Sequence, residues 1–156
     1  MINKTKLRRQ SGATIVEMAI VAPLVLLVLL SLLELSLMYF STLTMQYAIR
    51  EGGRFALTGQ TSLDPAVASQ RYSAVIQKIK NNSMGFYDKL GTTISVNGTK
   101  YTTSTYSNAM FGNAGDIIVM RLDCDWKVTT PLLAAFFANG KYHFAVAAVV
   151  RNEVYP

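Results

Sequence analysis

The feature that most constrains this chain of 156 residues is the uncharged apolar run from Met18 to Leu33. Apolar character resumes after Glu34 as far as Phe40. A helix over Ile15–Met38 would be about 36 Å long at 1.5 Å per residue, enough to cross a hydrocarbon core with some tilt. The run is longer than the apolar core of a secretory signal, and no small-residue cleavage site follows it. The sequence therefore predicts a transmembrane helix, which Pro23 kinks or locally unwinds.

The charges at the N-terminus predict the orientation of this helix. Lys4, Lys6, Arg8 and Arg9 stand in the first twelve residues without an acid, and they account for most of the net charge of +6. Cations flanking a membrane segment stay on the cytoplasmic side and are attracted to anionic lipid. We therefore expect a cytoplasmic N-terminus and an outward C-terminal domain, and we do not expect a nucleic-acid partner.

An acid stands at the head of the apolar segment, in Gly12-Ala13-Thr14-Ile15-Val16-Glu17. A carboxylate costs roughly 2.5–3.5 kcal/mol near the bilayer centre, and less toward the interface. If the chain were cut after Gly12, the new α-amino group of Ala13 would lie one helical turn from Glu17. That amine, on the same subunit or on a neighbour, is a natural partner for the carboxylate.

These residues resemble a known family. Gly-x-x-x-x-Glu after basic residues and before an apolar helix is similar to the processing site of type IV prepilins and pseudopilins. The stretch 8–57 and, loosely, the last dozen residues resemble the TadE-like proteins of tight-adherence (Flp/Tad, type IVc) pilus systems. The residues that carry this resemblance are Glu17, Pro23, Glu34-Leu, Tyr39, Gln46-Tyr-Ala48, Gly53-Arg54-Phe-Ala56 and Val150-Arg-Asn-Glu153-Val-Tyr. Major Flp pilins have Glu-Tyr at the site, whereas Met18 follows Glu17 here, which favours a minor pseudopilin.

The resemblance implies a non-catalytic minor pseudopilin that takes part in pilus assembly. A prepilin peptidase would cut between Gly12 and Ala13, and Glu17 would then pair with an N-terminal amine as helices pack. The implied partners are other minor pseudopilins, the major Flp pilin, the inner-membrane assembly platform and membrane lipid. The implied location is the bacterial inner membrane, as a single-pass protein with a periplasmic domain, or the pilus itself. No cofactor or metal is expected.

The main alternative is an uncleaved single-pass accessory protein whose outer domain binds an envelope or secretion-machine component. In that case Gly12 is incidental, and Glu17 is hydrated or paired with Arg8 or Arg9. A mature N-terminus at Ala13 separates the two hypotheses.

The predicted fold class is α+β, a pilin-like domain with one further helix and an antiparallel sheet. The expected division is a cleaved leader over residues 1–12, a transmembrane and membrane-proximal helix over 13–57, and an extracytoplasmic domain over 58–156. Gly52-Gly53 is expected to loosen or end the first helix, and Asp64-Pro65 to start the second, which ends at Asn81-Asn82. The face predicted to pack on the domain consists of Leu35, Met38, Tyr39, Thr42, Leu43, Met45, Ala48 and Ile49.

Strand patterns occupy the C-terminal half. Asn97-Gly98 predicts a hairpin within 94–101, and residues 102–115 are expected to form a surface loop. Alternation predicts a strand over 118–128 and another from Tyr142, with Phe144, Val146, Ala148 and Val150 on one face. For the phenylalanines of the apolar link 130–140, core packing is favoured over contact with a bilayer or a neighbour.

One group of residues has an enzyme-like composition: Cys124, His143, Asp123 and Asp125. If both apolar strand faces share one core, Trp126 opposes an even-numbered residue, and His143 faces away from Cys124. A Cys–His pair needs hydrogen-bond reach, which this register denies. We therefore expect a core cysteine, a surface histidine, a solvated pair of aspartates and no catalysis.

Overall fold

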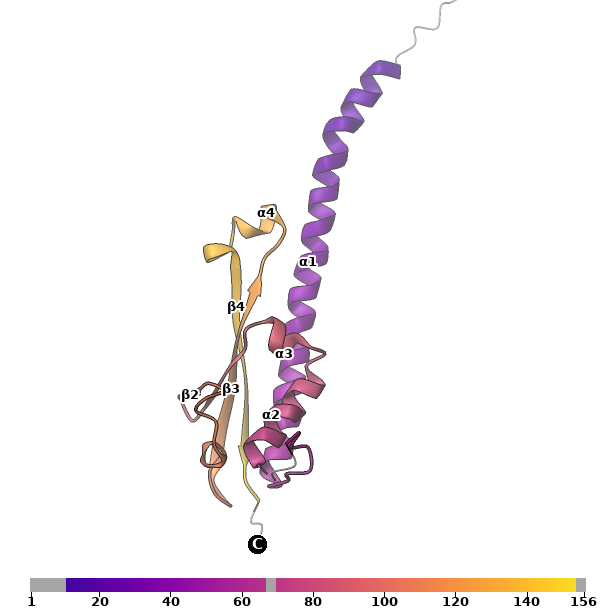
Figure 1. Ribbon diagram of the computed structural model, residues 1–156. Coiled ribbons are helices and arrows are strands. Elements are labelled where there is room, and N and C mark those ends of the chain that lie inside the picture. The colour runs from indigo at the N-terminus through magenta and orange to yellow at the C-terminus, as the bar shows by residue number, and fades with distance from the viewer. Residues whose placement is uncertain (1–10, 67–69, 154–156) are drawn as a thin grey trace, which may run out of the picture.

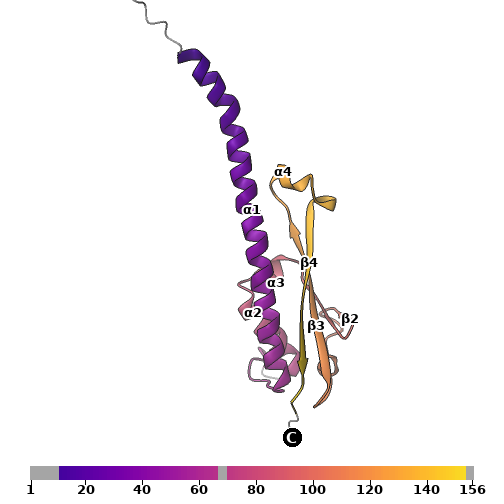
Figure 2. The same cartoon turned by 180° about the vertical axis from the view of Figure 1, so that it is seen from behind.

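The computed structural model describes residues 11–66 and 70–153. A long helix stands beside an antiparallel sheet of order β2-β1-β3-β4, and its N-terminal part projects beyond the rest of the molecule (Figures 1 and 2). The elements are α1 (Ser11–Leu57), α2 (Arg71–Asn82), α3 (Phe86–Lys89), β1 (Thr93–Val96), β2 (Thr99–Tyr101), η1 (Asn108–Phe111), β3 (Ile117–Lys127), α4 (Pro131–Ala134), η2 (Ala138–Gly140) and β4 (Lys141–Arg151). The predicted α+β class is confirmed.

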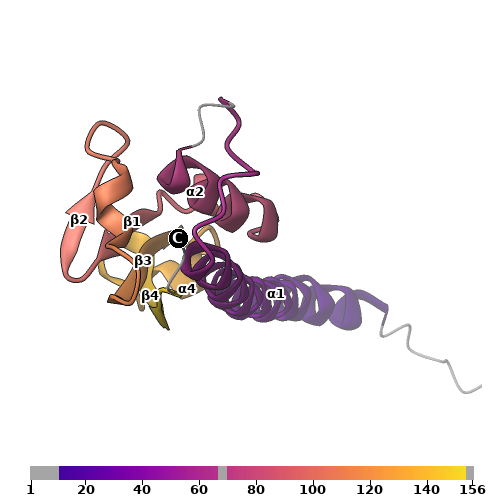
Figure 3. The ribbon, with the colours of Figure 1, turned by 90° about the horizontal axis from the view of Figure 1, so that it is seen from below.

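The sheet has one buried face, and the helices cover it. Seen along α1, α2 lies with it on the same side of the sheet (Figure 3). The register pairs Cys124 with Phe144 and Trp126 with Tyr142, so the even-numbered residues share the inner face as predicted. Residues of both strands and both helices meet in the core, including Met45, Ile49, Ile79, Ile118, Met120, Leu122 and Val146.

The predicted hairpin is confirmed, whereas the loop after it is more than a surface loop. Asn97 and Gly98 form the turn between β1 and β2 with φ of 50° and 83°, the left-handed region that such turns require. Beyond β2, η1 buries Met110 and Phe111, which are 3% and 0% exposed. These two side chains pack in the core and thereby anchor the segment 102–115 to the rest of the domain.

The face of α1 that packs on the domain agrees with the predicted stripe only in part. Leu35, Tyr39 and Leu43 are 42%, 68% and 51% exposed. The buried face repeats at spacings of three or four residues: Ser31, Glu34, Met38, Ser41, Met45, Ala48, Gly52 and Ala56. Met38, Met45, Ala48 and Ile49 are buried as predicted. Hydrophobicity alone missed the rest of the buried face, because it contains serine, glutamate and glycine. Ser31 and Ser41 donate to carbonyls of α1 itself, to Leu27 O and Met38 O, so their hydroxyls are satisfied when covered.

The local unwinding considered for Pro23 and the end of the helix expected at Gly52-Gly53 do not occur. The helix continues through Pro23 without unwinding, and it continues through Gly52-Gly53 to Leu57. The glycines serve close packing, since a Cβ on Gly52 would collide with Ile79 of α2 and one on Gly53 would lie 3.0 Å from a methyl of Val150.

The helix ends where other segments satisfy its last carbonyls. The guanidinium of Arg71 donates to Ala56 O through Nε (3.2 Å) and Nη2 (2.7 Å), and the N–H of Glu153 donates to Leu57 O (3.0 Å). A cation at this end also suits the helix dipole.

The second helix begins later than predicted, at Arg71 and not at Asp64-Pro65. Asp64 accepts hydrogen bonds from the N–H groups of Ala66 (3.1 Å) and Gln70 (2.8 Å). Its carboxylate therefore organises the connection before the helix. An aspartate followed by proline is equally compatible with this kind of turn.

Candidate membrane and assembly interface

The N-terminal half of α1 is an apolar helix without a covering layer. It is the one helix among the described residues that is long and apolar enough to cross a membrane, and only 6% of its most apolar eighteen-residue window is buried. The core helix of a soluble protein would be covered along such a window. The large apolar side chains from Ile15 to Leu26 are instead at least half exposed.

Glu17 is exposed near the start of this helix. Within residues 14–66 and 70–153 no hydrogen bond or ion pair involves its carboxylate. Gly12 and Ala13 lie in the first turn of α1, so the backbone of Ala13 is one turn from Glu17. The side chains of 11–13 and the basic leader lie outside the described residues. The processing site and the pairing of Glu17 therefore stay predictions.

A second carboxylate, Glu34, ties α1 to the sheet domain. Its Oε1 accepts the N–H of Thr129 (2.6 Å) and the indole N–H of Trp126 (3.4 Å), and Oε2 accepts the N–H of Thr130 (2.7 Å). The residue is only 7% exposed. Three donors stabilise the charged carboxylate in this covered position. Glu34 thus fixes where along α1 the domain begins.

Sequence reasoning missed this role, because it treated Glu34 as an interruption of the apolar run and as part of the family resemblance. Its partners lie more than ninety residues away in the chain. The local sequence around Thr129 and Thr130 does not point to Glu34, because their N–H groups precede the helix α4.

The outer half of α1 carries a further exposed apolar surface. Leu35, Tyr39, Leu43 and Tyr47, which we call the outer stripe, repeat every four residues and are 42–68% exposed. Leu43 and Tyr47 also line a shallow groove with Phe40 and with residues 81, 82 and 84. This surface lies beyond Glu34, beside the sheet domain, and not along the bare part of the helix.

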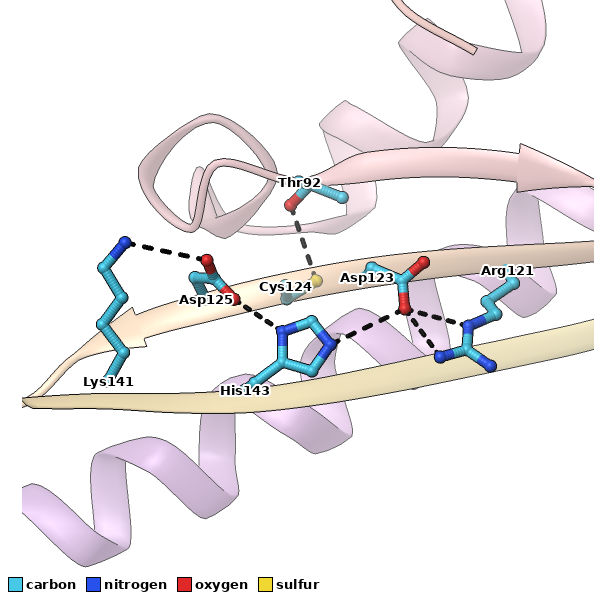
Figure 4. Close-up of polar contacts among 7 residues, drawn as sticks. All are labelled: Thr92, Arg121, Asp123, Cys124, Asp125, Lys141 and His143. Atoms are coloured by element: carbon cyan, nitrogen blue, oxygen red, sulfur yellow. Dashed lines mark hydrogen bonds and ion pairs between the residues drawn. The ribbon is translucent and has the colours of Figure 1, made fainter. Parts of the chain in front are cut away.

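The enzyme-like residues are divided between the two faces of the sheet (Figure 4). Cys124 is buried, and its Sγ lies 3.6 Å from Thr92 Oγ1, whereas His143 Nδ1 lies 2.6 Å from Asp125 Oδ1 on the opposite face. Burial raises the pKa of Cys124 to about 11. The hydrogen bond from His143 lowers the pKa of Asp125. The predicted separation of cysteine and histidine is confirmed, so no nucleophile–base pair forms.

The two aspartates differ in exposure, so the prediction of a solvated pair holds only for Asp125. The Asp123 side chain is 13% exposed, because Arg121 donates to its Oδ1 from Nε (2.9 Å) and Nη2 (2.8 Å) and His143 Nε2 lies 3.9 Å away. Asp125 is 47% exposed, with Lys141 Nζ at 3.9 Å. Among the described residues, no group of three or more His, Cys, Asp and Glu side chains could hold a metal ion.

Comparison with known protein families gives a match within α1. A family model described as TadE-like protein matches residues 12–54. Neither the curated proteins nor the solved structures gave a match. The matched segment runs from the predicted processing site through Glu17, Glu34 and the outer stripe, and it covers nearly all of α1. Over residues 12–54 this chain is therefore TadE-like.

Proposed function

We propose that this chain is a non-catalytic minor pseudopilin that takes part in assembly of a tight-adherence pilus. The observation that carries the proposal is the coincidence of the TadE-like segment with an uncovered apolar helix headed by Glu17. The family implies association with Tad pilus components. Processing by a prepilin peptidase after Gly12 and location in a bacterial inner membrane, with the sheet domain on the periplasmic side, belong to this proposal.

In this proposal the exposed parts of α1 pack against helices of other subunits. At 3.6 residues per turn, Glu17 and Leu35 lie about five turns apart on the same side of the helix. One neighbouring helix can therefore follow α1 from Glu17 to the outer stripe. Pairing of Glu17 with an N-terminal amine removes an isolated charge from an apolar environment, so it favours one axial register of the two helices.

The first test is the mature N-terminus. Intact mass and N-terminal sequence are determined for the protein from its native membrane, with and without the cognate prepilin peptidase. We expect a chain that begins at Ala13 only when the peptidase is present. A chain that keeps Lys4 to Gly12 under both conditions would contradict processing and would favour an uncleaved single-pass accessory protein.

The second test concerns Glu17. Glu17→Ala is expected to insert and to be cut, but to be lost from the complex that co-purifies with the normal protein. Glu51→Ala is the matched control, because Glu51 lies on the same helix outside the apolar run and is engaged with Arg54 at 3.6 Å. Co-purification of the Glu17 variant at normal yield would overturn the role of this carboxylate.

A further inference from the structure

The connection between β3 and β4 is apolar, yet it does not fold into the core. Residues 130–140, which we call the hairpin tip, contain Pro131-Leu-Leu-Ala-Ala-Phe-Phe-Ala138, and none of these eight is buried. Phe136 is 78% exposed and Leu132 is 41% exposed. Phe137 packs edge-on against Tyr142, with ring centroids 5.8 Å apart. The preference for core packing is therefore wrong for Phe136.

The tip lies beside the part of α1 that leaves the membrane in the proposed topology. Figure 1 shows α4 extending from the sheet toward the N-terminal half of α1. The Glu34 hydrogen bonds to Thr129 and Thr130 fix this level, and a groove between helix and tip is lined by Leu30, Leu33 and Pro131. Residues 11–33 of α1 precede Glu34. At 1.5 Å per residue they span about 35 Å, enough to cross a hydrocarbon core about 30 Å thick. The tip is thus level with the outer boundary of that core.

The charges around the tip are those expected of a surface that contacts lipid headgroups. From Trp126 to Asn152 the sequence contains no acid. Lys127 and Lys141 are direct cross-strand partners at the base of the tip, an arrangement that is unfavourable for like charges in water. Asp125 lies 3.9 Å from Lys141 and offsets part of this repulsion. Anionic headgroups would offset the remainder.

We propose that the hairpin tip is a membrane-surface anchor that inserts Leu132 and Phe136 into the outer leaflet beside α1, with Lys127 and Lys141 on anionic headgroups. The molecule then contacts the membrane twice, through the spanning helix and through the tip. An amphipathic segment of this kind lies about 5–10 Å into the headgroup and acyl boundary. The inference rests on the transmembrane topology of the proposed function, but not on processing or on pilus assembly.

The test measures depth in the bilayer with an environment-sensitive fluorophore on single cysteines of the full chain. In a Cys124→Ala background, Phe136→Cys reports the tip and Leu24→Cys reports the membrane helix. Val149→Cys is the control, 65% exposed on the same strand as Lys141 but toward its far end. The labelled proteins are reconstituted in vesicles of phosphatidylcholine and phosphatidylglycerol, which carry nitroxide lipids labelled either near the headgroup or deep in the chain.

We expect the shallow nitroxide to quench the label at 136, the deep one to quench the label at 24, and neither to quench the label at 149. Quenching at 24 with a response at 136 equal to that at 149 would overturn the anchor and leave the proposed function standing. Absence of quenching at 24 would contradict the membrane topology itself, and with it both proposals.

A charge-reversal experiment tests the lysines separately. Quenching of the label at 136 by the shallow nitroxide is measured in vesicles with and without phosphatidylglycerol, and the anionic lipid is expected to increase it. The double variant Lys127→Glu, Lys141→Glu is expected to abolish this gain. Lys100→Glu, on the exposed face of β2, is expected to leave that gain unchanged. An unchanged gain in the double variant would overturn the assignment of anionic headgroups to these lysines.

Discussion

At the scale of single residues, two carboxylates on one helix have opposite surroundings. Glu17 is exposed on the bare part of α1, whereas Glu34 is covered and holds three donors of the sheet domain. An unpaired carboxylate in an apolar segment is unfavourable until it finds a partner. A carboxylate that accepts several hydrogen bonds within the chain stabilises the fold instead. Glu17 is therefore the candidate for contact with another subunit, and Glu34 serves the position of the domain on the helix.

Glu34→Ala is expected to lower the free energy of unfolding by about 1–3 kcal/mol, because it leaves the covered backbone N–H groups of Thr129 and Thr130 without their acceptor. The measurement is chemical denaturation in detergent micelles, followed by the fluorescence of Trp126, which contacts this carboxylate. Glu51→Ala is the control on the same helix. A loss no larger than that of the control would remove Glu34 from the docking of the domain.

The thiol of Cys124 is expected to be unreactive in the folded protein. With a pKa of about 11, its thiolate fraction at pH 8 is about one in a thousand, so alkylation should be at least about a hundredfold slower than for an ordinary exposed cysteine. The measurement is mass spectrometry after iodoacetamide treatment, native and in denaturant. Thr103→Cys supplies the exposed comparison in the same chain. Equal rates at the two positions would contradict a buried, protonated thiol.

At the scale of elements, the long helix depends on glycines that allow its neighbours to approach. Gly52→Ala is expected to destabilise the protein by about 1–3 kcal/mol through overpacking against Ile79, even though alanine favours a helix by about 1 kcal/mol. Thermal or chemical unfolding measures the change. In the background of Ile79→Ala, the same substitution should cost much less, since the colliding side chain is gone. An equal cost in both backgrounds would exclude the contact as the cause.

The elements that could be predicted from the sequence are those with a strong local pattern. Alternation located β3 and β4 to within a residue or two and gave their common parity, and Asn97-Gly98 located the hairpin. The errors arose where distant residues decide. The end of α1 depends on Arg71, and the buried face of α1 depends on what α2 and the sheet present to Ser41 and Gly52.

The candidate site could be predicted only in part for the same reason. Glu17 stood out because its cost is visible in the sequence itself, as an acid in an apolar run. The role of Glu34 required knowing that residues 129 and 130 return to the level of α1. The exposure of Phe136 could not be read from an apolar composition, which is equally compatible with a core and with a membrane surface.

At the scale of the whole molecule, the exposed N-terminal half of α1 and the outer stripe are parts of one continuous helix. The direction in which one of them faces therefore determines the direction in which the other faces. Each residue inserted between them rotates one relative to the other by about 100° and separates them by about 1.5 Å. Insertion of two alanines after Leu29 is expected to abolish co-purification with partner subunits, because it turns Glu17 about 200° from the outer stripe. Insertion of four turns it by only about 40° and is expected to preserve part of the yield.

The two insertions also distinguish the direction that Glu17 faces from its distance to the domain along the helix. Four residues shift the helix by about 6 Å and two by about 3 Å. If the yield fell more with four alanines than with two, the distance of Glu17 from the domain, and not the direction it faces, would control assembly.

The same continuous helix has a mechanical consequence. The contacts between α1 and the domain are spread from Glu34 to Leu57, and they lie along the helix axis. A pulling force between the N-terminal end of α1 and the domain acts parallel to this row of contacts, the seam. It therefore loads the contacts together in shear and does not break them one at a time. A subunit built in this way yields to tension by sliding of the helix along the sheet, and its resistance grows with the length of the seam.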